Sequence, residues 1–387
     1  MARSRMGWSI VLIGLMAAFL FLDSYAALYL MVITATVILC SILAALYGSS
    51  NIDASISMPG SLRKRDSARG EIRLKLQRNR ILLRMKINVV IKNILTGEED
   101  FHQIAVASEG RREITIPFTL QNELCGCIEV RVCKLTIYDM FGIYRKTLDV
   151  NSDARINVFP DTFHMDVKLM PGRIEDSESI EYSCEKPGDD RSETFGIREY
   201  QQGDDIRNIH WKLTGKCDDL MIKMPSLPLE NSVLLLLETS NSGVTDKKSY
   251  IYDAMAEIYV TAGQTLINND IAYRTAWYDH ENSRMFVFDI ENEDDFYNAA
   301  AKMLCTPHKE DAENTCDHYI TEFGEFDKAH IMYITPENNS ALSQIPVEIR
   351  QTVIVCTYEK KEFTGEDVTL HFCSPDNYMH VMKYLEI

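Results

Sequence analysis

Two long uncharged segments open the chain and most restrict what it can fold into. Residues 7–22 contain no charged side chain, and residues 26–48 form a second such run after a short polar turn at residues 23–25. A helix needs about 20 apolar residues to cross a bilayer, with a lower limit near 17. The second run is long enough alone, whereas the first is marginal and also fits the apolar part of a signal peptide. Because no small-residue cleavage site follows the first run, we expect a transmembrane helical hairpin over residues 1–48, with a cleaved or single-span segment as the alternative.

Basic residues on both sides of this hairpin predict its orientation. Arg3 and Arg5 precede the first run, four basic residues lie within residues 63–69 after the second, and the turn between the runs carries only Asp23. Positively charged flanks remain on the cytoplasmic side of a membrane. We therefore expect a multi-pass protein of the cell membrane, with two helices and cytoplasmic soluble domains. An extracellular adhesion protein would need the opposite topology.

The composition excludes several other classes of protein. Hydrophobic residues make up 46% of the chain and charged residues 25%, which is the balance of a folded protein. The 40 basic residues stand against 57 acidic ones, so the formal net charge is −17. An acidic chain without a basic block is poorly suited to neutralise phosphates, and we therefore expect no nucleic-acid binding. A length of 387 residues suggests two or three domains.

Alternating apolar and polar residues predict a β-rich domain over residues 51–160. Five stretches have this period and contain many β-forming residues: residues 52–58, 71–77, 84–92, 113–118 and 128–138. Short strands at regular spacing, without helical patterns between them, are typical of a β-sandwich or a barrel-like domain. We expect a β-sandwich-like domain here.

Strands and helices alternate over residues 232–387, which predicts a different architecture. The predicted strands are residues 233–237, 271–278, 285–290, 331–334, 352–357 and 368–372. Helical patterns lie near residues 251–266, 296–304 and 312–323, and a last helix is expected from about Asn377. This alternation implies a doubly wound parallel sheet with helices on both faces. The predicted fold class is thus α+β and multidomain: a hairpin, a β-sandwich-like domain and a doubly wound α/β domain.

The connection between the two soluble domains, residues 161–231, begins with an acidic stretch. Residues 175–193 hold eight carboxylates against Lys186 and Arg191. This pattern predicts a solvated loop, with an acidic docking segment as the alternative.

The same connection contains a dense group of charged and aromatic residues. Gly203 followed by Asp204 and Asp205 predicts a tight turn, in which one aspartate accepts backbone N–H bonds and starts a short helical turn. The residues that we assign to an inter-domain or partner-binding surface are Arg198, Tyr200, Gly203, Asp204, Asp205, Arg207, His210, Trp211 and Lys212.

This group resembles the signature of the domain-of-unknown-function-58 family, Arg-x-Tyr-x-x-Gly-Asp-x-x-Arg-x-Ile-x-Trp-Lys. In this chain it runs from Arg198 to Lys212, and Gly215-Lys216 stands where members commonly have Ala-Arg. The turn from Asp139 to Ile143 also resembles the Asp-Pro-Phe-Gly-Leu turn that precedes the signature in the family. The resemblance covers the whole chain and implies a von Willebrand A-like C-terminal domain. It further implies a membrane-anchored partner of MoxR-type AAA ATPases, in a family without an established activity.

Three roles are open to this group of residues. It could fasten the two soluble domains together around a buried Trp211, present a surface to a partner protein, or carry out catalysis. His210 is the only plausible general base, with Asp204 or Asp205 to orient it, and no Ser or Cys nucleophile stands at a recognisable spacing. We therefore expect a scaffold or adaptor, with an enzyme using Asp204 and His210, or a degenerate metal site at Ser240, as the alternative.

A second candidate site follows the apolar strand at residues 233–237. Glu238, Ser240 and Ser242 stand where von Willebrand A domains place Asp-x-Ser-x-Ser to hold a magnesium ion. Carboxylate and hydroxyl oxygens at the carboxyl end of a central strand suit a hard cation. The chain departs from that pattern, because Glu238 replaces the aspartate and Pro336 stands where a later aspartate is expected. The residues after the third strand, 291–293, also offer no threonine. We expect no cofactor, and a hydrogen-bonded turn capping the next helix, with a degenerate Mg²⁺ site at these residues as the alternative.

Four further residues have the chemistry of zinc ligands: Cys305, His308, Cys316 and His318. Zinc sites pair ligands two to four residues apart on each side, a spacing that this group meets only in part. We therefore expect no zinc site here.

Overall fold

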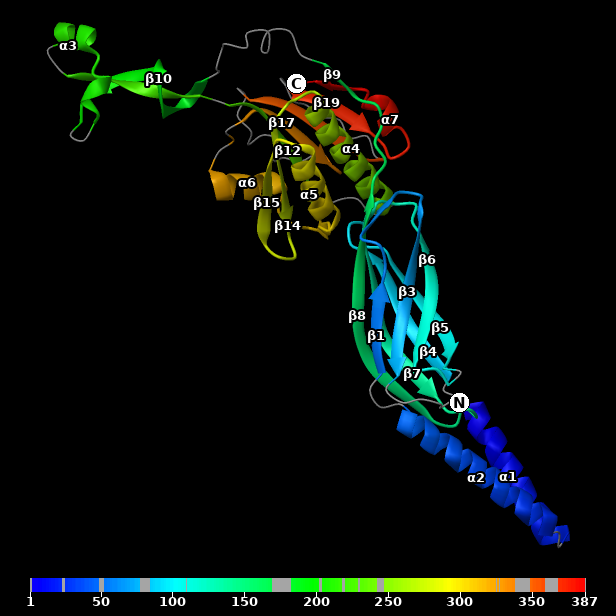
Figure 1. Ribbon diagram of the computed structural model, residues 1–387. Helices are drawn as coiled ribbons and strands as arrows, with labels where there is room; N and C mark the ends of the chain where they lie inside the picture. Colours follow the sequence, from blue (N-terminus) through cyan, green and yellow to red (C-terminus); the bar gives the residue numbers. More distant parts are fainter. Residues whose placement is uncertain are drawn as a thin grey trace. The chain divides into compact units, whose positions relative to one another are not determined.

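The computed structural model divides the chain into two units, Met1–Phe159 and Pro160–Ile387. Each is described by itself (Figure 1). The structure describes residues 2–22, 25–48, 52–76, 84–108, 110–168, 182–201, 204–217, 220–228, 230–241, 247–324, 326, 328–337, 349–358 and 368–386.

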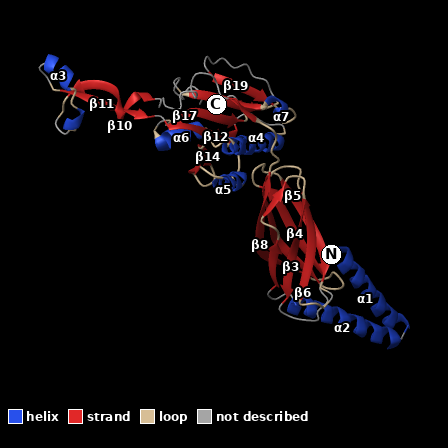
Figure 2. Cartoon of the chain, turned by 45° about the horizontal axis from the view of Figure 1, so that its top comes forward, coloured by secondary structure: helices blue, strands red, loops and turns tan. Residues whose placement is uncertain are grey.

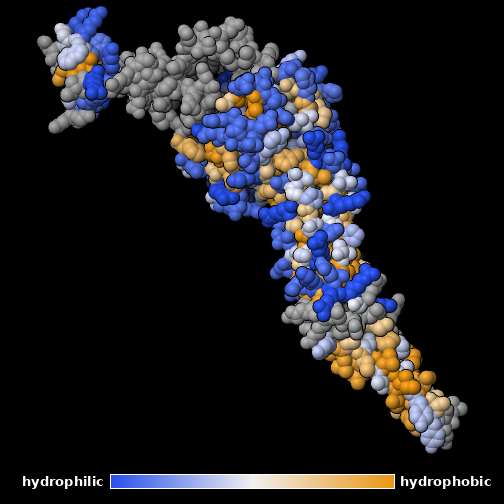
Figure 3. All heavy atoms as spheres, in the orientation of Figure 1, coloured by the Kyte–Doolittle hydropathy of each residue, from blue (hydrophilic) through white to orange (hydrophobic). Residues whose placement is uncertain are grey.

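The first unit begins with two antiparallel helices, α1 (Ala2–Leu22) and α2 (Tyr25–Gly48). Both are long and apolar enough to cross a membrane, over Ser4–Phe21 and Tyr25–Tyr47. Their apolar side chains are largely exposed rather than packed into a protein core, and Figure 3 shows the resulting hydrophobic surface. Two apolar helices at this position agree with the predicted helical hairpin.

The rest of the first unit consists of two β-sheets. One contains β1 (Ile52–Ser57), β3 (Ser67–Leu76) and β6 (Glu113–Gln121), in the order β1-β3-β6. The other has the order β2-β8-β7-β4-β5 and contains β2 (Ser61–Arg63), β4 (Arg84–Asn93), β5 (Glu99–Ala107), β7 (Gly126–Tyr138) and β8 (Arg145–Phe159). The five predicted strands are all present.

The inner faces of these two sheets share one apolar core. Alternate residues of β3 are buried, including Ile72 and Leu74, and they lie in the same cluster as Ile87 of β4 and Leu135 of β7. Sharing a core across two sheets is the arrangement of a β-sandwich. Ala45 of α2 is buried in this cluster as well, so the end of the second helix packs against the sandwich.

The second unit is built around a six-stranded sheet with the order β15-β14-β12-β17-β18-β19. Its strands are β12 (Glu230–Leu237), β14 (Tyr273–Asp279), β15 (Arg284–Ile290), β17 (Lys328–Thr335), β18 (Arg350–Cys356) and β19 (Val368–Cys373). All six predicted strands are present, but the sheet is not wholly parallel, because β15 runs antiparallel to β14. The connection between these two strands is too short for a crossover, so the chain must turn back on itself.

Helices cover both faces of this sheet (Figure 2). On one face lies α4 (Lys248–Asn268), whose Tyr259 hydroxyl bonds to the Thr275 hydroxyl of β14 at 2.7 Å. On the other face α6 (Thr315–Phe323) packs Cys316 and Tyr319 into an apolar cluster with residues of β12. The helix α5 (Glu293–Leu304) contacts α4 and β15. These elements agree with the predicted doubly wound α/β arrangement.

The C-terminus differs from the prediction. A helix begins near Asn377 as predicted, but it does not close the chain: the short helix α7 (Tyr378–Val381) is followed by a strand, β20 (Tyr384–Glu386). The strand β20 pairs in parallel with β9 (Asp166–Lys168). Another short pair joins β13 (Ser240–Asn241) to β16 (Lys309–Glu310).

The connection before the sheet also differs from the prediction. Residues 182–193, expected as part of an acidic loop, belong to the strand β10 (Tyr182–Glu199), which pairs antiparallel with β11 (Met221–Pro228). Several shifts of register interrupt this pairing, as expected where charged residues, Pro187 and Gly188 replace the regular alternation. The remainder of the acidic stretch, residues 175–181, lies outside the described residues.

Candidate functional site

The family-like segment from Arg198 to Lys212 begins in the last two residues of β10 and continues into the connection before β11. It contains a 3₁₀ turn, η1 (Ile206–Asn208), and a short helix, α3 (Trp211–Cys217). We call residues 196–217, as far as the structure describes them, the signature segment.

An ion pair fixes the first turn of the signature segment. Both terminal nitrogens of Arg198 donate to the carboxylate of Asp204, each at 2.7 Å. Asp204 also accepts the backbone N–H of Gln201 at 2.8 Å. The hydrogen bond from the Arg198 guanidinium lowers the pKa of the Asp204 carboxyl, and the same bond raises the pKa of Arg198. A bidentate arginine pair of this kind holds both side chains in one geometry.

Two other side chains start the helical turns that follow. Asp205 accepts the backbone N–H of Arg207 at 3.0 Å, which confirms the prediction that an aspartate starts a helical turn here. His210 precedes α3, and its Nδ1 atom accepts the backbone N–H of Leu213 at 3.0 Å. This is the bond of a helix N-cap, which satisfies a donor that has no partner within the helix. One ring nitrogen of His210 is therefore engaged in holding the local fold.

Trp211 is not buried, and the expectation of a buried tryptophan at this position is wrong. Its side chain is 66% exposed. The burial that holds this segment together comes instead from Ile209 and Ile222, which are buried and form a β-bridge. Leu220 is also exposed, at 47%, close in sequence to β11.

The structure locates most of the other residues predicted for this surface. Arg207 and Lys212 are exposed, and Tyr200 is half-buried, with its backbone N–H bonded to the carbonyl of Leu220. Gly203 lies outside the described residues. The signature segment therefore combines a fixed internal frame with exposed basic and aromatic side chains.

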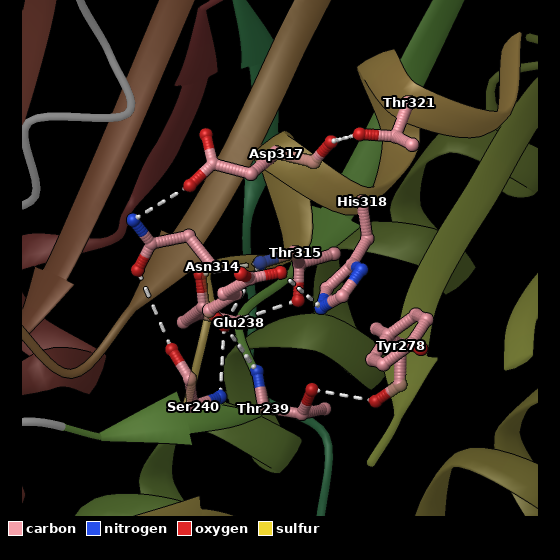
Figure 4. Close-up of polar contacts among 10 residues, drawn as sticks. Glu238, Thr239, Ser240, Tyr278, Asn314, Thr315, Asp317, His318 and Thr321 are labelled. Atoms are coloured by element: carbon pink, nitrogen blue, oxygen red, sulfur yellow. Dashed lines mark hydrogen bonds and ion pairs between the residues drawn. The ribbon is translucent and has the colours of Figure 1, made fainter. Parts of the chain in front are cut away.

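The second candidate site lies at the carboxyl end of β12, the strand between β14 and β17. Glu238 lies there among several polar contacts (Figure 4). Its side chain is fully buried. Its Oε1 atom accepts the backbone N–H groups of Thr239 and Ser240, at 2.9 and 2.8 Å. The hydroxyl and backbone N–H of Thr315 donate to the same carboxylate at 3.1–3.2 Å, and so does the hydroxyl of Tyr333.

Burial raises the pKa of Glu238, while the hydrogen bonds from Tyr333, Ser240 and Thr315 lower it, and burial has the larger effect. Thr315 is the first residue of α6, so the carboxylate lies at the positive end of that helix. The predicted hydrogen-bonded turn is confirmed. The prediction that it caps the next helix is wrong, because Glu238 accepts from the start of α6, whereas α4 has no side-chain cap.

The sequence pattern missed two members of this site. Thr315 provides the threonine that residues 291–293 do not, and it comes from beyond α5. Tyr333 lies within a β17 segment that reads as an ordinary buried strand. Tyr333 is flanked by apolar residues and Thr315 is not. Neither residue stands in a sequence pattern from which its contact with Glu238 could be deduced.

The Glu238 carboxylate does not fit the role of a magnesium ligand. A carboxylate has about four lone-pair positions, and those of Glu238 receive five donor groups of the protein. Ser240 directs its hydroxyl towards the Asn314 side chain, at 3.4 Å. Ser242, the third predicted ligand, lies outside the described residues.

The residues with zinc-ligand chemistry are dispersed. His308 stacks on Tyr252 and His318 on Tyr278, with ring centroids 3.8 and 3.5 Å apart. Cys316 belongs to α6 and is buried in the apolar cluster between this helix and the sheet. Within the part of the chain that the structure describes, no three or more His, Cys, Asp or Glu side chains form a group that could hold a metal ion.

Comparisons with known proteins find a family match for one part of the chain and weak structural similarities for others. The CARDB domain of the PF1109 protein from Pyrococcus furiosus, solved in complex with di-metal ions, has 16% identity over 28% of this chain and 87% of that chain, with a TM-score of 0.21. A beta-glucosidase from Kluyveromyces marxianus has 11% identity over 28% of this chain and 15% of that chain, with a TM-score of 0.17. Scores this low support no inference about function. No curated protein matches the chain. Residues 196–276 match the family described as protein of unknown function DUF58, and the resemblance of the signature segment to that family is thereby confirmed.

Proposed function

We propose that this protein is a membrane-anchored scaffold or adaptor whose signature segment binds a partner protein. One observation carries the proposal: Trp211 is 66% exposed within the segment that matches the family. Tryptophan and arginine are the residues most enriched among interface anchors, whereas a large exposed aromatic side chain contributes little to the stability of a lone fold.

The side chains around Trp211 support an interaction role. Lys212 and Lys216 are exposed on the same short helix, and Arg207 is exposed on the turn before it. A basic surface with an aromatic anchor suits an acidic patch on another protein, because opposite charges guide the encounter and the ring supplies the buried area. As the family resemblance implies, we propose a MoxR-type AAA ATPase as the partner.

The proposed location is the cell membrane, with both helices spanning it and the soluble units in the cytoplasm. The uncharged runs in α1 and α2 and the basic residues that flank them support this topology. A reporter that is active only outside the cytoplasm, fused after Ile387, should therefore stay inactive. Strong external signal would contradict the topology and favour an extracellular adhesion protein.

We further propose that the second unit is a von Willebrand A-like domain that acts as a support rather than as a metal-dependent binding site. Its central strand β12 lies between β14 and β17, where doubly wound sheets commonly bind ligands. The carboxylate expected to reach a metal there is engaged by donors of the protein itself, as described above for Glu238. A domain of this kind can position the signature segment without a cofactor.

The alternative, an enzyme using Asp204 and His210, has less support. Asp204 binds Arg198 and Gln201, and the Nδ1 atom of His210 caps α3. A histidine general base needs a ring nitrogen within reach of the proton that it takes from a substrate, and this alternative also relies on Asp204 to orient the ring. The geometry directs Asp204 to the arginine instead.

Affinity purification of the full chain from membranes tests the interaction, with mass spectrometry of the co-purifying proteins. We expect a MoxR-type ATPase with the wild-type chain and its loss with Trp211→Ala. Tyr250→Ala is the matched control, because Tyr250 is another exposed aromatic residue of the second unit, 49% exposed, outside the signature segment. Equal recovery of the ATPase with all three chains would contradict the assigned surface.

A further inference from the structure

One turn of the β-sandwich contacts the beginning of α1. We call residues 139–143, between β7 and β8, the docking turn. The Nε atom of Arg5 donates to the carbonyl of Ile143 at 2.8 Å, and the ring of Trp8 lies edge-on to Phe141, with centroids 4.9 Å apart. The contact therefore lies where the charged start of α1 gives way to its apolar run.

The docking turn also contacts the last part of α2. The backbone N–H of Met140 donates to the hydroxyl of Ser41 at 3.1 Å, and the Ser41 hydroxyl lies 3.5 Å from a carboxylate oxygen of Asp139. Ala45, one turn later in α2, is buried in the core of the sandwich. Both helices thus meet the same end of the sandwich. If the hairpin spans a membrane, as the proposed function holds, this end faces the lipid headgroups.

Basic side chains gather at this end. Arg84 of β4 and Arg145 of β8 both pair with Tyr138, the last residue of β7 before the docking turn. The loop before β6 contributes Arg111 and Arg112, and the backbone of Arg112 accepts a hydrogen bond from Leu76 at the end of β3. We call the following exposed residues the basic rim: Arg5, Arg84, Arg111, Arg112 and Arg145.

Three acidic residues lie near the rim. Asp139 is buried, and its carboxylate accepts the backbone N–H groups of Phe141 and Tyr144. Asp53 and Glu113 stand directly opposite Lys75 on the two strands that pair with β3.

The opposite end of the sandwich carries charges of both signs. The connection between β4 and β5 and the start of β5 carry Glu98, Glu99 and Asp100, all exposed. Arg63 and Arg65 are also exposed there, so that end mixes the two signs, whereas the rim beside the hairpin is formed by arginines, although the whole chain has a net charge of −17.

From this placement we propose that the basic rim binds the phosphate groups of anionic phospholipids and holds the sandwich against the membrane surface. Guanidinium groups bind phosphate oxygens in a bidentate manner. A basic residue close to an anionic bilayer gains about a fivefold preference, equivalent to about 1 kcal/mol, and the gain fades within a Debye length of about 10 Å. The position of the rim beside the hairpin favours lipid over a soluble phosphate or an acidic protein. Trp8 and Met140, the latter 50% exposed, supply side chains suited to the interface.

Hydrogen exchange of the full chain in lipid nanodiscs tests the proposal. One set of discs contains phosphatidylcholine alone, and the other equal parts of phosphatidylcholine and phosphatidylglycerol. We expect peptides covering residues 110–113 and 139–146 to exchange several-fold more slowly in the anionic discs. Peptides covering residues 94–100, at the opposite end, should exchange equally in both. Salt of about 0.5 M should remove the difference, because it shortens the Debye length.

Two double variants distinguish lipid binding by the basic rim from a general effect of the protein's net charge. Arg84→Gln with Arg145→Gln should lose most of the protection, whereas Arg63→Gln with Lys92→Gln, which removes two charges near the opposite end, should keep it. Equal exchange in both kinds of disc, or protection that survives the loss of Arg84 and Arg145, would overturn the proposal while leaving membrane insertion intact. A chain that elutes apart from both kinds of disc would instead contradict the membrane anchor, and the lipid-binding rim with it.

Discussion

The carboxylate of Glu238 accepts both the backbone N–H and the hydroxyl of Thr315, a residue 77 positions further along the chain. The contact joins the end of the central strand β12 to the first residue of α6, across the face of the sheet. The carboxylate thus accepts hydrogen bonds from the start of α6, although several strands and helices lie between the two in the sequence. We therefore assign Glu238 a structural role in the second unit.

Loss of this carboxylate should destabilise the second unit strongly. Glu238→Ala leaves several buried donors without an acceptor, and each such donor costs about 1–3 kcal/mol, so we expect a loss of at least about 3 kcal/mol. Tyr333→Phe leaves the buried carboxyl group without one of its donors and should cost about 1–3 kcal/mol. Urea unfolding followed by the fluorescence of the buried Trp277 measures both. Glu310→Ala, which removes an exposed partner of Lys248, should change little, and an equal loss there would contradict the assignment.

Magnesium should bind weakly to the same residues. Because the Glu238 oxygens already receive protein donors, we expect dissociation constants in the millimolar range or above. Isothermal titration calorimetry of the full chain with MgCl₂ measures this affinity. Micromolar binding that disappears in Ser240→Ala would show that the hydrogen bonds give way to a metal ion.

The stability of the second unit should fall between about pH 7 and pH 5.5. Burial lowers the pKa of His280 to about 4, with smaller contributions from His318 and Lys309, and burial also lowers the pKa of His330 to about 4. Both histidines have pKa values near 6.5 in the unfolded chain, so that state takes up protons that the folded state does not. Their contribution to stability is thus present above about pH 6.5 and is lost as the pH falls towards 4.

Urea midpoints across this pH range check that prediction. His330→Gln should make the profile flatter, because it removes one of the two groups. The exposed His102 of β5 provides the control, and His102→Gln should leave the profile unchanged. If the urea midpoint of the wild-type chain does not change between pH 7 and pH 5.5, the burial of neutral histidines is contradicted.

Much of the fold follows from local patterns in the sequence. The six strands of the α/β sheet are apolar runs between helical patterns, and a run such as Val233–Leu237 is buried on both faces. The strand β5 was harder to predict, because its side chains are mostly exposed and it lies at the edge of its sheet. The antiparallel direction of β15 was predictable in principle, since only a tight turn at residues 280–283 separates it from β14.

The candidate sites were less predictable, because they depend on contacts between distant residues. The pairing of Arg198 with Asp204 lies within one turn, so its charges can be recognised in the sequence. The exposure of Trp211 cannot be recognised in the sequence, because the same helical spacing fits a buried or an exposed ring. It depends on which residue packs against β11, and in the structure that residue is Ile209, which pairs with Ile222. Thr315 reaches Glu238 only because the sheet brings the start of α6 to the end of β12.

Replacement of His210 separates an adaptor from an enzyme. His210→Ala removes the cap of α3, which typically costs about 1 kcal/mol, and should leave partner binding and cellular function largely intact. His210→Asn should restore the cap. Complementation, thermal unfolding and co-purification of the partner are measured together. A folded, partner-binding but inactive His210→Ala variant would reject the adaptor in favour of an enzyme, since general-base catalysis contributes about 10²–10⁴ in rate.

The affinity of the purified chain in nanodiscs for a purified MoxR-type ATPase tests the central claim most directly. Because Trp211 is exposed, Trp211→Ala should change the free energy of unfolding by no more than about 0.5 kcal/mol. If the ring anchors the interface, the same substitution should weaken binding roughly 30-fold, the effect of losing about 2 kcal/mol at a hot spot. Binding that is unchanged in a folded Trp211→Ala variant would contradict the account.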